Sequence, residues 1–386
     1  MSVRLLSHNR LTLLRSGREY FPALEAAIRE ARREIFLETY IYEDDGTGRR
    51  FAAALCEAAA RGVAVHLIVD GFGSKDMPEK LSRRLRDAGV ELLVYRPKIS
   101  PWTLRRHRLR RMHRKVAVVD ARVAFVGGIN IVDDMHTPRQ VPPRYDYAVR
   151  IEGPLLRPLQ AAVERLWNRV ARVGGERRRQ VEGRADVDVA PKGSQRAALV
   201  VRDNFRHRDD IERAYLKAIE SAREEIVLAN AYFFPGIRFR RALLRAAGRG
   251  VRVVLLLQGR VEYALLHYAS HALYGTLLEA GVEIYEYHRS FMHAKVAVVD
   301  GHWATVGSSN IDPFSLSLAR EANVVVEDRG FAAELHHSLR AAMKKGARVV
   351  AKTRWFRQPV WKRIPIWLAY ALVRFITGMV GYGGKF

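Results

Sequence analysis

The sequence has a single cysteine, Cys56, among its 386 residues. One cysteine cannot form a disulfide, a redox pair or a cysteine-ligated zinc site within one chain, so scaffolds that depend on these are excluded. The N-terminal run MSVRLLSHNRLTLLRSG also lacks the apolar core of a secretory signal peptide. We therefore expect the body of the protein to stay in the cytoplasm.

Acidic residues are few relative to basic ones. The chain carries 66 Lys and Arg against 41 Asp and Glu, which gives a formal net charge of +25 at pH 7. Such an excess attracts polyanions, so nucleic acid and anionic membranes are both candidate partners. The apolar share of 48% is ordinary for a globular protein and allows a well-packed core.

The two halves of the chain repeat the same order of segments. The first half contains AAIREARREIFLETYIYEDDG, FAAALCEAAARGVAVHLIVDG and RMHRKVAVVDARVAFVGGIN. The second half contains KAIESAREEIVLANAYFFPG, RRALLRAAGRGVRVVLLLQGR and FMHAKVAVVDGHWATVGSSN. Residues 63–69 and 251–257 are short, apolar and β-branched, as in buried strands, and they alternate with amphipathic helical patterns. The sequence therefore predicts an α/β fold built from two repeats.

The boundaries of the repeats follow from composition. We predict a first repeat at 1–173, a linker at 174–196, a second repeat at 197–350 and a separate tail at 351–386. The linker is polar, charged and contains glycine, which is typical of a connection between structural units. A surface excursion inside one continuous domain is the alternative interpretation.

Each repeat carries the same five residue types at the same spacing. The sets are His113, Lys115, Asp120, Gly127 and Asn130 in the first half and His293, Lys295, Asp300, Gly307 and Asn310 in the second. With each type at roughly 5% abundance, a random match at one position has a frequency of about one in three million. Its occurrence at matching places in a repeat therefore indicates a functional motif.

The chemistry of the motif suits displacement at a phosphodiester. Alternate residues of a strand point to one face, so each half presents an imidazole and an ammonium together, with an Asn amide nearby. One neutral histidine can attack phosphorus, and the other, protonated, can give its proton to the departing alcohol. The lysines and asparagines can stabilise charge on the non-bridging oxygens, so no metal or other cofactor is required.

These motifs resemble those of the phospholipase D superfamily, over roughly residues 10 to 345. Within it, the sequence is most similar to the short bacterial cardiolipin synthases, which lack N-terminal membrane spans. The resemblance implies a pseudo-twofold α/β/α sandwich with the active site at the interface. It also implies a phosphohistidine route in which His113 is the nucleophile and His293 the acid and base, an order that the residues themselves do not distinguish.

The resemblance gives roles to further residues. The family places a carboxylate downstream of each motif to orient a histidine, and Asp146 and Glu321 occupy these positions; an ordinary strand-edge acid is the alternative. Within the catalytic motifs, we expect Asp120 and Asp300 to be structural supports and not direct participants. We predict that the substrate phosphate is bound by Asn130, Asn310 and Ser308. Gly128 replaces Ser308 in the first half, so the two halves are unequal there.

Two segments favour an anionic membrane as a partner. PKISPWTLRRHRLRRMHRK, which leads to His113, interleaves basic and apolar residues; a solvated charge run or a nucleic-acid clamp are the alternatives. The tail has an apolar run at 364–382 that Pro365, Arg374 and several glycines interrupt, so an interfacial helix suits it better than a spanning one. A helix packed on the body is the alternative. We expect peripheral attachment to the cytoplasmic side of the inner membrane.

The expected activity is that of a cardiolipin synthase, with phosphatidylglycerol or phosphatidylethanolamine as donor and phosphatidylglycerol as acceptor. A hydrolytic phospholipase D would use the same histidines with water as acceptor. A phosphodiesterase nuclease is disfavoured because DNA cleavage needs no aromatic and basic tail, and no nucleic acid is expected as a partner. Because both motifs lie in one chain, a monomer is sufficient for one active site.

Overall fold

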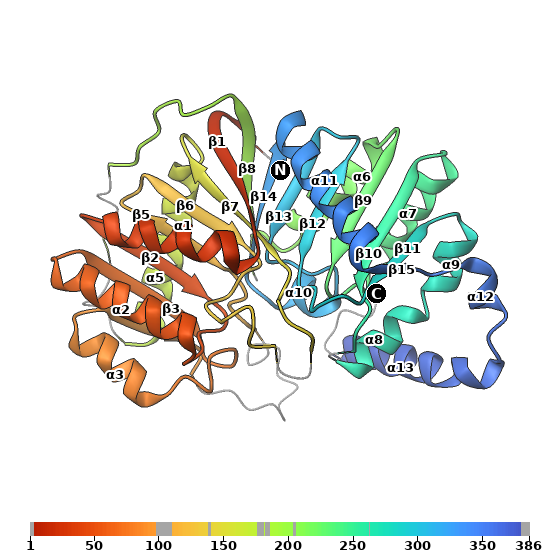
Figure 1. Ribbon diagram of the computed structural model, residues 1–386, viewed down its shortest axis with the longest axis horizontal. Coiled ribbons are helices and arrows are strands. Elements are labelled where there is room, and N and C mark those ends of the chain that lie inside the picture. Colours follow the sequence, from red (N-terminus) through yellow and green to blue (C-terminus); the bar gives the residue numbers. More distant parts are fainter. Residues whose placement is uncertain are drawn as a thin grey trace.

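The computed structural model describes residues 4–97, 110–137, 140–175, 181, 186–203, 206–261 and 263–379. Two similar halves lie side by side and meet along the strands at the centre of the molecule (Figure 1). Most of the predicted basic segment before His113, residues 98–109, lies outside the described residues, as do parts of the predicted linker.

The first half consists of β1 (Leu6–Arg15), α1 (Ser16–Glu30), β2 (Glu34–Thr39), α2 (Gly46–Ala60), β3 (Ala64–Asp70), α3 (Glu79–Asp87), β4 (Glu91–Tyr95), β5 (Val116–Val119), β6 (Val123–Gly127), β7 (Tyr147–Glu152) and α5 (Leu156–Val173). The second half consists of β8 (Gln195–Arg202), α6 (Asp210–Ser221), β9 (Glu225–Asn230), α7 (Ile237–Gly248), β10 (Arg252–Gln258), α8 (Ala264–His271), α9 (Tyr274–Glu279), β11 (Glu283–Tyr287), β12 (Lys295–Val299), β13 (Trp303–Gly307), α10 (Pro313–Ser317), β14 (Glu321–Glu327), α11 (Arg329–Gly346) and β15 (Ala347–Val349). Helices α12 (Lys352–Phe356) and α13 (Val360–Met379) follow.

The strand order shows the internal symmetry. From the centre outwards the first half runs β1-β7-β6-β5-β2-β3-β4, and the second half runs β8-β14-β13-β12-β9-β10-β11-β15. Strands β2, β3 and β4 pair in parallel, as do β9, β10 and β11, whereas β5 and β12 pair antiparallel to β2 and β9. Because β1 pairs with β8, the two halves share one sheet. The predicted α/β fold with two symmetry-related repeats is confirmed.

Three hydrophobic cores hold the layers together. One core packs α1, α2 and α3 on the first half, and another packs α6, α7 and α9 on the second. The third core lies on the opposite face and contains residues of both halves, including Trp167 of α5 and Leu335 of α11. Burial of this apolar surface joins the halves, since neither half can cover its inner face alone.

The tail packs on the second half through one side of α13. Ile366, Ala369 and Val373 are buried, and their spacing of three and four residues places them on one face of the helix. Helix α13 lies against α8. Among the residues that the structure describes, no helix combines the length and apolar character needed to cross a bilayer.

Candidate active site

The backbone ties each histidine motif to the opposite half. Met112 and Arg320 form a parallel β-bridge, and the His113 N–H donates to the Arg320 carbonyl over 2.9 Å. Tyr145 and Met292 form the equivalent bridge, and the His293 N–H donates to the Tyr145 carbonyl over 2.8 Å. Each histidine therefore lies beside the residue that follows Arg320 or Tyr145 in the chain. This residue carries a carboxylate in both cases: Glu321 beside His113 and Asp146 beside His293.

The two carboxylates are exchanged between the halves. His113 Nδ1 lies 3.0 Å from Glu321 Oε1, and His293 Nδ1 lies 2.7 Å from Asp146 Oδ2. A carboxylate at Nδ1 fixes the ring orientation and leaves Nε2 directed to the reactants. Each half therefore contributes a histidine to the site and the carboxylate that orients the histidine of the other half. Sequence reasoning identified both carboxylates, but not which histidine each one contacts.

The two lysines lie beside the histidines but have unequal surroundings. Lys115 Nζ donates to the His113 carbonyl over 2.7 Å and lies 5.2 Å from the centre of the Tyr40 ring. Lys295 is fully buried; its Nζ lies 2.7 Å from His293 Nδ1 and 3.5 Å from Asp146 Oδ2. The second motif is thus the more tightly connected of the two.

Burial controls the protonation of the site. Desolvation lowers the pKa of His113, although Glu321 opposes the shift, and it lowers the pKa of His293 well below its ordinary value, with Lys295 adding to the effect. Desolvation also lowers the pKa of Lys115 to about 7. Burial raises the pKa of Asp146 against the opposing charge of Lys295. Without a bound anion, the site therefore favours neutral imidazoles at neutral pH.

Two of the three residues predicted to bind the substrate phosphate are asparagines, Asn130 and Asn310, and each makes a hydrogen bond through its side-chain amide. Asn130 Oδ1 accepts from the Ile41 N–H over 3.1 Å, so its acceptor is engaged while its amide donors carry no such bond among the described residues. Asn310 Nδ2 lies 3.5 Å from Ser315 Oγ. The asparagine roles stay predictions.

The Ser308 hydroxyl is engaged within the site. Its hydroxyl donates to Glu321 Oε2 over 2.5 Å and accepts from the Ala322 N–H over 3.1 Å. Ser308 therefore holds the carboxylate that orients His113, and its predicted contact with the substrate phosphate stays a prediction. The corresponding Gly128 packs so closely on Asp146 that an added Cβ would lie 2.4 Å from both carboxylate oxygens. The difference between Gly128 and Ser308 thus concerns how each carboxylate is supported.

Asp120 and Asp300 lie at the far ends of β5 and β12, away from the histidines. The Asp120 carboxylate accepts the backbone N–H groups of Arg32, Arg33 and Glu34 over 2.8–2.9 Å. The Asp300 carboxylate accepts those of residues 223–225 over the same range. Although they belong to the motif, these carboxylates cap the start of β2 and β9 and do not reach the reacting groups, in line with the expected supporting role.

Two residues of the site were missed by the sequence analysis. The Tyr40 ring lies 4.8 Å from the His113 ring, and buried Asp70 accepts the Met112 N–H over 2.7 Å. Both residues follow or end a parallel strand, and the carboxyl ends of parallel strands meet at one edge of a sheet. The sequence analysis could therefore have found both residues from their positions at the carboxyl ends of predicted parallel strands.

Comparison with known proteins gives one consistent likeness. A family model described as "Cardiolipin synthase, PLD-like domain" matches residues 24–167 and 215–343. The chain is 40% identical to cardiolipin synthase B of Escherichia coli strain K12, over 97% of this chain and 90% of that protein. It is 31% identical to cardiolipin synthase A of Pseudomonas fluorescens, over 90% of this chain and 71% of that protein.

A likeness to a solved structure extends over the whole fold. The crystal structure of phosphatidylserine synthase from Haemophilus influenzae Rd KW20 superimposes with a TM-score of 0.74, covering 100% of this chain and 97% of that one. The identity is 11%, so this likeness concerns the fold alone.

Replacing Asp120 by alanine is expected to lower stability and leave the chemistry intact. Three backbone N–H groups lose a buried carboxylate, which should cost about 3 kcal/mol of unfolding free energy. Asp300→Ala removes the same three bonds at a more exposed place, so it should cost less, because water can replace the carboxylate. Urea unfolding measures both effects. A normal unfolding midpoint combined with lost turnover would contradict the assignment.

The low pKa of Lys115 predicts an alkaline loss of activity. As pH rises through about 7, Lys115 loses its proton and can no longer stabilise negative charge, so kcat/KM should fall. His113 must be neutral, and desolvation lowers its pKa, so protonation of His113 should not limit activity in this range. Lys115→Arg should be slower and should lose the part of the alkaline fall that Lys115 causes, because arginine stays protonated; deprotonation of the acid His293 accounts for what remains. The same fall in this variant would assign it to another group.

Proposed function

The chain belongs to the cardiolipin synthases with a phospholipase D-like domain, and we propose that it passes a phosphatidyl group from one phospholipid to a glycerol hydroxyl of phosphatidylglycerol. With phosphatidylglycerol as donor, the products are cardiolipin and glycerol; phosphatidylethanolamine is an alternative donor. The observation that carries the proposal is the exchange of Glu321 and Asp146 between the halves, which fixes two imidazoles in one site.

The reaction would proceed in two displacements. His113 Nε2 attacks phosphorus, a nitrogen–phosphorus bond forms, and the bond to the donor's headgroup oxygen breaks as His293 gives that oxygen a proton. In the second step, His293 takes the proton from the acceptor hydroxyl, whose oxygen attacks phosphorus and releases His113. Lys115 and Lys295 stabilise the charge on the phosphoryl oxygens throughout.

We assign the role of nucleophile to His113, the order that the resemblance to the phospholipase D superfamily implies. His113 Nδ1 faces the carboxylate of Glu321, which accepts a proton and leaves Nε2 with its lone pair. As the acid, His293 must be the imidazolium, which donates its Nδ1 proton to Asp146 and keeps a second proton on Nε2 for the departing oxygen. Lys295 donates to the His293 carbonyl. A bound phosphodiester anion would favour the charged form further.

Burial supports transfer to an alcohol over transfer to water. The side chains of Lys115 and Lys295 are buried, and those of His113 and His293 are only 15% and 11% exposed. Little room is left for bulk water beside the proposed intermediate, and exclusion of water suppresses hydrolysis. We therefore favour the synthase over a hydrolytic phospholipase D.

An apolar face beside the site supports attachment to a lipid surface. The outward side of α13 exposes large apolar side chains, namely Trp361, Ile364, Trp367, Leu368, Leu372 and Phe375. Helix α13 lies along α8 (Figure 1). Helix α8 begins at Ala264, next to the exposed Tyr263. Monomeric soluble proteins rarely expose such patches unless they bind something. We propose that this face lies on an anionic membrane at the cytoplasmic side, with the tail in the interface.

A row of aromatic rings leads from the start of α8 to the active site. The Tyr263 ring lies 5.6 Å from that of Tyr232, which lies 6.4 Å from that of His293. Tyr232, Tyr263 and Leu266 also line a small cavity. We propose that a lipid headgroup leaving the membrane plane at this edge would reach the second histidine beside these aromatic rings.

The nucleophile can be identified with an activated donor. A phosphatidyl ester of 4-nitrophenol needs no acid for departure, so His293→Ala should release a burst of about one equivalent of nitrophenol and then stall. His113→Ala should give no burst and should lose at least about a thousandfold in cardiolipin formation from phosphatidylglycerol vesicles. The exposed His302→Ala is the matched control and should behave as wild type. The opposite pattern of bursts would exchange the two roles.

The lipid-facing side of α13 can be tested by removing two aromatic rings. Trp367→Ala combined with Phe375→Ala should cost about 2 kcal/mol even at half insertion, so binding to phosphatidylglycerol vesicles should weaken by more than tenfold. Both side chains are exposed, so the fold should be kept. Val173→Ala, an exposed apolar residue at the end of α5, is the control. Unchanged co-sedimentation with vesicles would reject the proposed membrane face.

A further inference from the structure

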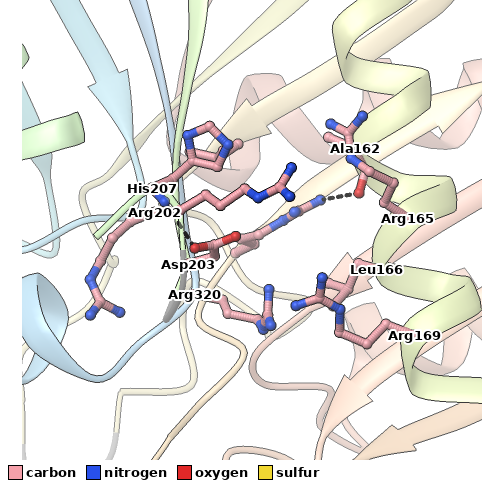
Figure 2. A pocket seen from close by; sticks show the side chains of 11 residues that line it. Ala162, Arg165, Leu166, Arg169, Arg202, Asp203, His207 and Arg320 are labelled. Carbon is pink, nitrogen blue, oxygen red and sulfur yellow. Dashed lines mark hydrogen bonds between the residues drawn. The ribbon is translucent and has the colours of Figure 1, made fainter. Parts of the chain in front are cut away.

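A pocket lined with arginines lies next to the active site but contains none of its reacting groups. It has a volume of about 750 Å³ and lies between α5 and the end of β8. Arg165 and Arg169 line it from α5 on one side, Arg202 and Asp203 line it from the other, and Arg320 contributes as well (Figure 2). Both halves of the chain therefore build this pocket.

The arginines form a buried floor and an exposed rim. Arg114, Arg202 and Arg320 are 3–8% exposed, whereas Arg165, Arg169 and Arg206 are exposed. Asp203 is the one acidic residue among the lining residues that the structure describes. Three buried guanidinium groups around one cavity are unusual, because buried charges are normally matched by partners of opposite charge.

The buried carboxylate beside Arg114 gives only partial compensation to that guanidinium group. Glu38 Oε2 lies 2.7 Å from Arg114 Nη2, but burial raises the pKa of Glu38 to about 7, so its negative charge is incomplete at neutral pH. Arg114 Nε is buried and has no hydrogen-bond partner among the described residues. Arg320 Nε makes a long hydrogen bond, of 3.4 Å, to the Tyr95 hydroxyl.

We propose that this pocket binds a phosphate-bearing anion at a site separate from the substrate phosphate between the two histidines. The planar guanidinium fork matches phosphate oxygens and forms short, charge-assisted hydrogen bonds with them. The exposed rim gives an anion access, and the buried floor provides donors in a place of low dielectric. Free phosphate and the headgroup of an anionic phospholipid share this chemistry.

The position of the floor connects the pocket with the catalytic motifs. Arg114 lies between His113 and Lys115 in the chain, and Arg320 directly precedes Glu321. The His113 N–H donates to the carbonyl of Arg320, so the two floor arginines belong to backbone segments that are bonded to each other. An anion held by both side chains would therefore brace the segments that carry the nucleophile and its carboxylate.

Equilibrium dialysis of the full chain with labelled inorganic phosphate tests the proposal. We expect two bound equivalents in wild type, one at each site. Arg165→Ala combined with Arg169→Ala should weaken one of them by at least about tenfold. Because both residues are exposed, this variant avoids the folding risk of replacing buried Arg114. Arg241→Ala combined with Arg245→Ala, an exposed pair with the same spacing on α7, is the matched control and should bind as wild type.

Competition with glycerophosphoglycerol, the water-soluble headgroup of phosphatidylglycerol, distinguishes the two sources. Displacement of the rim-dependent phosphate would identify a headgroup site, and retention would identify a site for free phosphate. Equal binding of phosphate by the rim variant and the α7 control would overturn the proposal. Neither result depends on turnover, so failure of the proposed synthase activity would leave this test unaffected.

Discussion

The exchange of carboxylates between the halves is the interaction on which the site depends. His113 is oriented by Glu321 and His293 by Asp146, so each half is incomplete without the other. The two β-bridges at Met112 and Tyr145 and the core shared by α5 and α11 keep the halves in register. Separation of the halves by a small distance would therefore remove the orientation of both imidazoles at once.

This dependence explains why so many charged groups are buried at the interface. Lys295, Asp146 and Glu321 are almost fully buried, at a cost in desolvation that each pairing only partly offsets. Without a bound anion, the same desolvation favours neutral histidines, and it brings the pKa of Lys115 to about 7. A bound phosphodiester would bring negative charge to this cluster. The buried charges therefore lower the stability of the empty interface and raise its affinity for substrate.

The sequence was sufficient to predict the repeat, the α/β class and the identity of the paired residues, because these follow from spacing and from strand patterns. It did not show that the carboxylates cross, since nothing local distinguishes contact within a half from contact between halves. Nor did it show the bond between the Ser308 hydroxyl and Glu321, a residue thirteen positions away whose approach depends on the pairing of β13 with β14. The arginine pocket was also not predictable, because its lining comes from segments far apart in the chain.

A symmetric fold has to support an asymmetric reaction. Two-step transfer needs one nucleophile and one proton carrier, whereas duplication supplies two similar histidines. The structure differs between the halves at the places that decide this: Ser308 supports Glu321, Gly128 leaves Asp146 without such a donor, and Lys295 approaches His293 Nδ1. Each difference acts on the Nδ1 side of an imidazole, where it changes the charge and the hydrogen bonds around the carboxylate that stabilises the protonated ring. We infer that the two roles are divided by such changes behind the histidines, and not by the motif itself.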